Sequence, residues 1–366
     1  AGFPVTLIDR ERFPRHKLCG EFSSPEWLRH FRDIGVFDEM IGAGGRRIAE
    51  TRFYSMNGRN AAVPSGWLGN GELALSLSRA EMDSALLKRA LGCGVDVRDG
   101  TTVTAIEKDG SRVTGLSIRD ANGAVDRVDA DIFIDATGRA AILAKLVERS
   151  EQQATEAKAA RIGFKAHIRG ADIHPDRCEI YSFPGGYAGL SPIENGLANH
   201  CFMVKADLVR ELDGGADRIV RELIFQNKRA RQTLINAEPV TRWLSVAVTG
   251  FGERSTRFAD NGFSIGDAAA FIDPFTGSGM LMALESAEIF AECIVASGVD
   301  MGNIAAAYKL RHSERFRRRL AVCRVLRYAA FVPVIGTIAV STLAASSGFR
   351  RILARSTRRT GLPENP

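Results

Sequence analysis

One stretch of the sequence, residues 262–292, combines a carboxylate, closely spaced glycines and the expected start of an apolar helix. The N–H groups and the dipole at a helix start attract negative charge, and glycines let a flat or anionic ligand approach the backbone closely. A carboxylate at the end of the preceding strand can accept hydrogen bonds from sugar or ribitol hydroxyls. The candidate ligand-binding residues of this stretch are Asp267, Pro274, Gly277, Ser278, Gly279 and Met280.

The whole pattern, GDAA followed by a proline, GSGM and an apolar helix, resembles the second FAD-binding motif of glutathione-reductase-type flavoproteins. Within these it is most similar to the superfamily of flavin monooxygenases, flavin-dependent halogenases and geranylgeranyl reductases, which are FAD-dependent oxidoreductases. The resemblance implies that Asp267 holds the ribitol chain and that the helix start faces the flavin ring. The alternative is a strand, turn and helix whose glycines serve only packing, and further context has to decide between them.

A short apolar segment at the start of the sequence, residues 4–8, reads as a strand that ends on Asp9 and Arg10. In a dinucleotide-binding βαβ unit, the second strand ends on the acid that binds the adenosine ribose, after a glycine-rich turn on the first strand. No such turn precedes this strand in the sequence. We therefore expect an N-terminally truncated chain whose first βα unit is missing. An exposed acid at the end of an ordinary edge strand is the alternative.

The loop RHKLCGE, residues 15–21, resembles the segment that runs beside the flavin in the same superfamily. This resemblance assigns Cys19 and Gly20 to cofactor binding and leaves Glu21 as a candidate acid or base. No CxxC pair accompanies Cys19, so a small packing side chain is favoured over a reactive thiol.

Helical spacing follows over residues 25–40 and again after Ser78, which is a plausible N-cap. Arg79 at the start of the second helix, with Asp83 four residues later, resembles the arginine that contacts the FAD pyrophosphate or the flavin edge. A solvated arginine beside a helix is the alternative. The resemblance also places the backbone near Val103 at the adenine ring.

Residues 159–248 have the alternation of strands, as expected for a sheet that covers a substrate. Within them, GGYAGLSP, residues 185–192, matches the spacing of the strand that lies over the flavin in the superfamily, which makes Tyr187 and Gly189 the candidate substrate residues. Gly189 stands where a tryptophan is frequent. This difference disfavours halogenation and implies a roomier pocket for a bulky hydrophobic substrate, whereas a plain core aromatic is the alternative for Tyr187.

The composition is that of a globular protein long enough for two domains, with 366 residues, 45% hydrophobic and 25% charged. Residues 309–366 contain 13 basic and 2 acidic residues, a net charge of +11, whereas the remainder contains 36 basic and 41 acidic residues, a net charge of −5. The acidic main body argues against nucleic-acid binding, and the basic tail indicates an anionic partner such as a membrane surface. Docking of the tail as helices on the FAD domain and a membrane-spanning segment are the alternatives.

Six scattered cysteines, without a CxxC pair or metal-ligand spacing, indicate no metal site and a reducing, cytoplasmic setting with possible membrane association.

The predicted fold class is α/β, with a Rossmann-like FAD-binding domain, a mixed-sheet substrate domain and a helical C-terminal tail. The FAD-binding domain is assigned to residues 1–158 and 249–308 with interleaved segments, the substrate domain to 159–248 and the tail to 309–366.

The expected function is that of an FAD-dependent monooxygenase that hydroxylates or epoxidises a bulky hydrophobic or aromatic molecule, with electrons from NAD(P)H directly or through a separate flavin reductase. A reductase of polyprenyl double bonds and a truncated, non-catalytic fragment are the alternatives. The sequence names no catalytic side chain.

Overall fold

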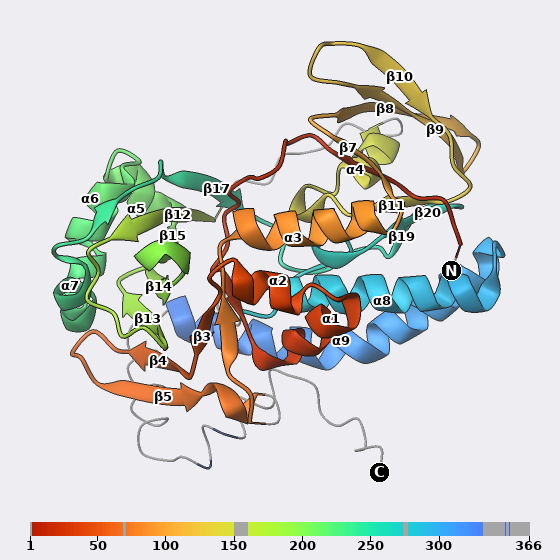
Figure 1. Ribbon diagram of the computed structural model, residues 1–366. Helices are drawn as coiled ribbons and strands as arrows, with labels where there is room; N and C mark the ends of the chain where they lie inside the picture. Colours follow the sequence, from red (N-terminus) through yellow and green to blue (C-terminus); the bar gives the residue numbers. More distant parts are fainter. Residues whose placement is uncertain are drawn as a thin grey trace.

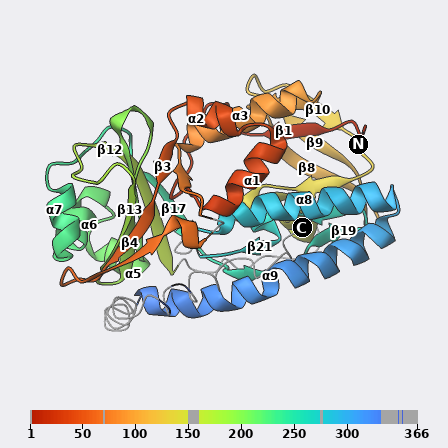
Figure 2. The ribbon, with the colours of Figure 1, turned by 60° about the horizontal axis from the view of Figure 1, so that its bottom comes forward.

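The computed structural model describes residues 2–68, 71–149, 160–273 and 277–331, together with residues 348 and 351. The chain forms two neighbouring bodies (Figure 1). One is a large sheet covered on one face by short helices. The other consists of small sheets and longer helices, and the two longest helices run along one side of the molecule (Figure 2).

Eight strands form the large sheet: β4 (Glu50–Tyr54), β5 (Asn60–Pro64), β12 (Arg161–Arg169), β13 (Arg177–Phe183), β14 (Gly186–Pro192), β15 (Ala198–Lys205), β16 (Glu238–Pro239) and β17 (Leu244–Val248). Their order is β16-β12-β15-β14-β13-β4-β5, with β17 also paired to β12. All neighbours are antiparallel except β13 and β4, which are parallel. The mixed sheet expected from the alternation in residues 159–248 is therefore present.

The two faces of the large sheet have different neighbours because side chains alternate along each strand. Phe164 of β12 and Phe202 of β15 stack with ring centroids 5.0 Å apart in the core on one face. Lys165 and Cys201, next to them in sequence and paired in register, point to the opposite face. Three helices cover the first face: α5 (Ala206–Glu211), α6 (Ala216–Glu222) and α7 (Lys228–Leu234).

Two strands of the large sheet, β4 and β5, come from the first part of the chain, which the sequence assigned to the FAD-binding domain with interleaved segments. The chain therefore crosses from one body to the other before residue 50 and returns after β5. The division at residues 158, 248 and 308 stays a prediction.

The second body contains the short parallel pairs typical of α/β proteins. β1 (Thr6–Asp9) pairs with β7 (Asp96–Asp99), and β11 (Phe133–Asp135) pairs with β20 (Gly262–Ser264). Carboxyl ends of parallel strands are the edge at which α/β sheets bind ligands. The remaining strands are β2 (Phe22–Ser23), β3 (Arg46–Ile48), β6 (Ala74–Ser76), β8 (Thr102–Asp109), β9 (Arg112–Arg119), β10 (Val125–Val128), β18 (Gly252–Glu253), β19 (Arg257–Ala259) and β21 (Ala270–Phe271).

Residues 25–40, expected to be one helix, form two. α1 (Pro25–Ile34) ends because Gly35 adopts a left-handed φ of 81° and donates its N–H back to the last turn. The chain then turns into α2 (Phe37–Gly42). The predicted N-cap is confirmed: the Ser78 hydroxyl accepts from the N–H of Glu81 at 3.3 Å at the start of α3 (Arg79–Gly92). One further helix is α4 (Ile142–Arg149).

The two longest helices are α8 (Gly279–Ser297) and α9 (Met301–Phe331), which lie side by side (Figure 2). Phe316, Leu320 and Cys323 of α9 are buried in one cluster with Met282 of α8. The described part of the basic tail is therefore helical and docked on the protein. The tail beyond α9, apart from residues 348 and 351, lies outside the described residues, so a membrane contact there stays a prediction. In the part of the chain that the structure describes, no helix is long and apolar enough to cross a bilayer.

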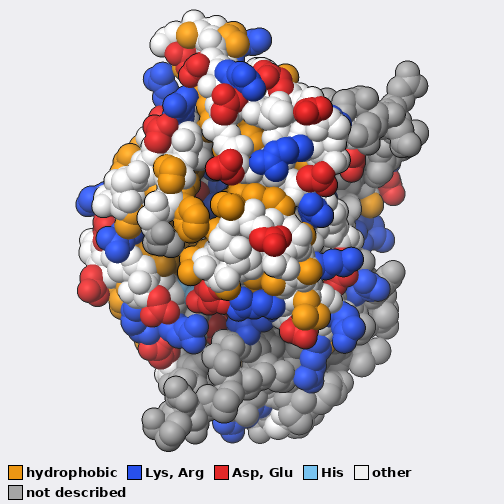
Figure 3. Space-filling model, turned by 90° about the vertical axis from the view of Figure 1, so that its right-hand side faces the viewer, with side chains coloured by type: hydrophobic (Ala, Val, Ile, Leu, Met, Phe, Trp, Pro, Cys, Tyr) orange, Lys and Arg blue, Asp and Glu red, His pale blue; other side chains and the backbone are white. Residues whose placement is uncertain are grey.

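Basic and acidic side chains intermingle on the face shown in Figure 3.

Candidate functional site

The predicted FAD motif folds as expected around the start of α8. β20 is followed by a single helical turn, Gly266–Ala268, that carries Asp267. The Gly266 N–H donates to the Ser286 hydroxyl of α8 at 2.8 Å, which fixes this turn against the helix. A side chain added at Gly279 would meet an Asp267 carboxylate oxygen at 3.8 Å, so the acid lies beside the first residue of α8.

The glycines of the motif keep the approach to this helix start open. Gly277 has a left-handed φ of 59°, which favours glycine, and Ser278 is buried at the N-cap position of α8. Pro274 lies outside the described residues.

Four cations, each from a different segment of the chain, act on Asp267. Burial raises the pKa of this carboxyl, and the charges of Lys17, Arg139, Arg254 and Arg79 oppose that rise. The same concentration of positive charge affects Lys17, whose pKa is lowered by burial and by neighbouring arginines. Positive charges crowded beside the positive end of a helix dipole form a cradle for an anion. The residues present therefore fit the pyrophosphate and ribitol of FAD.

The sequence analysis named neither Arg139 nor Arg254 as a site residue, and it did not single out Lys17 within the RHKLCGE loop. Arg139 follows the Thr137-Gly138 turn after β11. No local pattern marks Arg254, whose guanidinium donates to the backbone oxygen of Arg139 at 2.8 Å.

The structure brings Arg79 and Cys19 to the same place. Arg79 forms a bidentate ion pair with Asp83, with N···O distances of 2.7 and 2.8 Å. Burial opposes its charge, yet the nearby Cys19 and Asp83 raise the pKa of Arg79 above its usual range. Cys19 Sγ lies 3.5 Å from Met280 Sδ in the first turn of α8. The predicted contacts of Cys19, Gly20, Arg79 and Met280 with the flavin thus share one neighbourhood and stay predictions.

The expected adenosine-side residues form a second group. Asp9 ends β1, and its carboxylate accepts from the Glu11 N–H and from Arg15, each at 2.9 Å. Arg10 is exposed and pairs with Glu11 at 3.1 Å. Val103 of β8 packs in an apolar cluster that includes Ile8 of β1. β1 and β8 therefore lie close together, whereas Arg10 points to solvent. The contacts of Asp9, Arg10 and Val103 with the adenosine stay predictions.

The two candidate substrate residues lie on β14. The Tyr187 hydroxyl donates to the Asp273 carboxylate at 2.9 Å, and burial together with Asp273 raises the pKa of Tyr187. Tyr187 thus ties the large sheet to the loop before α8. Gly189 faces Ile180 and Cys201, with room for an added Cβ 3.4 Å from the Ile180 side chain.

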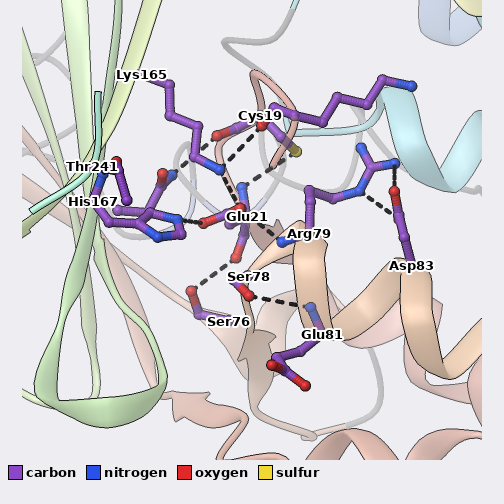
Figure 4. Close-up of polar contacts among 12 residues, drawn as sticks. Cys19, Glu21, Ser76, Ser78, Arg79, Glu81, Asp83, Lys165, His167 and Thr241 are labelled. Carbon is purple, nitrogen blue, oxygen red and sulfur yellow. Dashed lines mark hydrogen bonds and ion pairs between the residues drawn. The ribbon is translucent and has the colours of Figure 1, made fainter. Parts of the chain in front are cut away.

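Glu21, proposed from the sequence as an acid or base, is the centre of a buried polar cluster (Figure 4). Its carboxylate contacts the side chains of Lys165 and His167 on β12 and the backbone N–H of Arg79. No motif pointed to Lys165 or His167, because they follow Glu21 by more than 140 residues.

The comparisons with known proteins agree with this geometry. A family described as "FAD binding domain" matches residues 1–295. A menaquinone reductase from Mycolicibacterium smegmatis is 27% identical over 93% of this chain and 83% of its own length. A digeranylgeranylglycerophospholipid reductase from Methanosarcina acetivorans is 28% identical over 86% of this chain and 75% of its own length. A variant of the flavin-dependent brominase Bmp2 has the same fold, with a TM-score of 0.76 at 20% identity, over 97% of this chain and 89% of that one. The chain belongs to the FAD-binding-domain family and is an FAD-dependent oxidoreductase.

Proposed function

We propose that the protein is a reductase that adds hydrogen across double bonds of a long, apolar isoprenoid lipid. The observation that carries this proposal is the similarity, over most of both chains, to two reductases named for menaquinone and for a digeranylgeranyl phospholipid. Both names denote lipids with long isoprenoid chains. The sequence analysis ranked this reaction second, behind monooxygenation.

The face of the large sheet that is turned towards the RHKLCGE loop suits such a substrate. Around Gly189 it presents the Ile180 and Cys201 side chains. An isoprenoid chain offers no polar group to recognise, so it needs a surface that is apolar and free of bulk. The buried Tyr187, tied to Asp273, closes one end of this surface.

Bound FAD would supply the hydride, while the protein binds, orients and excludes water. Asp267, Lys17 and Arg79, with the start of α8, would hold the ribitol and pyrophosphate. The Cys19–Gly20 backbone would lie against the ring. We expect NAD(P)H, directly or through a separate flavin reductase, to supply the electrons.

The tail fits a substrate that resides in a membrane. Residues 309–366 carry a net charge of +11, and Lys309, Arg317 and Arg324 of α9 are exposed. Basic residues near an anionic leaflet each add roughly 1 kcal/mol of attraction. We therefore propose contact with a membrane surface at this end of the molecule.

Monooxygenation of a bulky hydrophobic molecule is the second candidate, because the same FAD site would serve both reactions. The reactions differ in whether the reduced cofactor reacts with the double bond of the substrate or with oxygen. The test is anaerobic turnover. The FAD-loaded protein, chemically reduced, is mixed with an isoprenoid quinone in detergent and the product is analysed by mass spectrometry. We expect the isoprenoid chain to gain two hydrogens without oxygen, and this gain to remain after the quinol ring has been reoxidised in air. A product that forms only in air and gains one oxygen atom supports the monooxygenase, and a product that requires halide supports a halogenase.

A further inference from the structure

A buried carboxylate ends the loop expected to contact the flavin. Glu21 is 0% exposed (Figure 4). Its Oε1 accepts from Lys165 Nζ and, at 2.7 Å, from the backbone N–H of Arg79, and its Oε2 lies 2.7 Å from His167 Nε2. Lys165 and His167 are alternate residues of β12 and so point from the same face. One carboxylate therefore joins the loop, the large sheet and the start of α3.

Two more hydrogen bonds hold the same loop to the sheet. Lys165 Nζ also donates to the backbone oxygen of Lys17, and Asn199 Nδ2 of β15 donates to that of Cys19, both at 3.0 Å. Glu21 has a φ of 53°, which is uncommon for a residue other than glycine and persists only where the surroundings enforce it. The backbone of Cys19 and Gly20 is thus fixed from both sides.

The cluster is also a balanced pair of charges. Burial raises the pKa of Glu21, but the hydrogen bond from His167 and the charge of Lys165 outweigh it, so the pKa lies below its usual value. The carboxylate is therefore ionised at neutral pH, opposite the Lys165 ammonium. His16, whose ring meets that of His167 edge-on at 4.9 Å, is another titratable neighbour. Breaking such a buried pair leaves an uncompensated charge in a medium that screens poorly.

We propose that Glu21 is a positioning residue for the flavin reaction and that Lys165 is its counter-charge. Together they hold the Cys19–Gly20 backbone against the cofactor and balance the charge beside it, so that they set both the affinity for FAD and the reduction potential of bound FAD. This inference rests on the proposed function, since it takes the RHKLCGE loop as part of the flavin site.

The charge balance makes a prediction that a purely mechanical anchor does not. Glu21→Gln leaves the Lys165 ammonium uncompensated, which favours the electron-rich reduced cofactor and raises the potential. Lys165→Met leaves a negative charge and lowers the potential. A loop that is merely loosened moves both variants in the same direction.

The experiment uses the full chain loaded with FAD. Flavin fluorescence titration gives the dissociation constant, and anaerobic spectroelectrochemical titration gives the midpoint potential. We expect each single variant to bind FAD about tenfold or more weakly, because a buried charge has lost its partner. We expect the potentials to shift in opposite directions and the double variant, Glu21→Gln with Lys165→Met, to return towards the wild-type potential.

A matched control lies on the opposite face of the same sheet. Glu179 of β13 is also 0% exposed and bonds to Arg229 at 2.9 Å and to the Tyr181 hydroxyl at 2.6 Å. Glu179→Gln should lower the unfolding temperature and leave the potential unchanged.

Potentials that stay at the wild-type value, or shift in the same direction in both single variants, overturn the inference. If Glu21→Gln does not fold, Lys165→Met decides alone: its potential falls, whereas the charge-conserving Lys165→Arg keeps the wild-type value. Wild-type protein that binds no FAD overturns both the proposed function and this inference. FAD binding without lipid reduction overturns the proposed substrate alone, and the potentials of the variants still decide the inference.

Discussion

Glu285→Gln should show that a buried ion pair, rather than apolar contact alone, fastens α9 to α8. Glu285 is 3% exposed and contacts both Arg315 and Arg319 of α9, the latter at 2.9 Å. Arg319 is itself 3% exposed, and its Nε has no hydrogen-bond partner among the described residues. The substitution keeps the shape of the side chain and removes its charge, so that two arginines then face each other without a counter-ion.

The expected cost follows from this burial. Breaking a buried pair by neutralising one partner costs about 3–5 kcal/mol. A chain of this size loses about 2 °C of unfolding temperature per kcal/mol, so we expect a decrease of about 6–10 °C. Burial raises the pKa of Glu285, but the two arginines lower it by more, so the pKa lies below its ordinary value. The stabilisation is therefore present above the ordinary carboxyl pKa of about 4.3 and is lost as the pH falls through the lower folded value.

The assay is thermal unfolding at neutral pH, followed by circular dichroism, with a matched substitution between the same two helices. Glu292→Gln removes a carboxylate from the contact with Arg311, where the side chains are 52% and 43% exposed. An exposed pair contributes about 0–1 kcal/mol, so this variant should unfold within about 2 °C of wild type. Equal shifts in the two variants, or a Glu285→Gln shift below about 2 °C, would refute the reasoning.

Three further predictions concern pH, the cofactor and the large sheet. Burial lowers the pKa of His200 and of His312 to about 4, so each is neutral in the folded protein at neutral pH. The free energy of unfolding should therefore fall by up to about 3 kcal/mol per histidine as the pH falls from 6.5 to 4. Urea unfolding of His200→Phe should show a smaller loss over the same pH range than wild type. Asp267→Ala should weaken FAD binding about tenfold or more in a fluorescence titration, with an unfolding temperature for the FAD-free protein close to wild type. Gly186→Ala places a Cβ 2.2 Å from a backbone oxygen of the neighbouring strand and should destabilise the protein by about 3 kcal/mol in urea unfolding. Gly189→Ala places its Cβ no closer than 3.4 Å to any atom beyond its own and the two adjacent residues and should change the stability by less than about 1 kcal/mol.

Some parts of this protein follow from short stretches of sequence. The start of α8 is encoded by the Gly277-Ser278-Gly279 run and the apolar residues after it, and the structure begins the helix at Gly279. The strands of residues 159–248 follow from their alternation, and Gly35 ends α1 through a conformation that favours glycine. The FAD-binding family is likewise evident, because its motif needs adjacent residues with fixed backbone geometry.

Other parts depend on contacts that leave no local pattern. The sequence could not show that Arg254 lies beside Arg139, or that Lys165 meets Glu21, because these pairs are separated by more than 100 residues and isolated charged residues usually face solvent. It could not assign β4 to the large sheet either, since alternation predicts a strand but not its partner.

Local chemistry thus determined most of the elements, the cofactor motif and membership of the FAD-dependent oxidoreductases, because each is set by neighbouring residues. Only the tertiary structure decided which buried charges stand together around that motif, since packing of distant segments sets both their distance and their exposure to water.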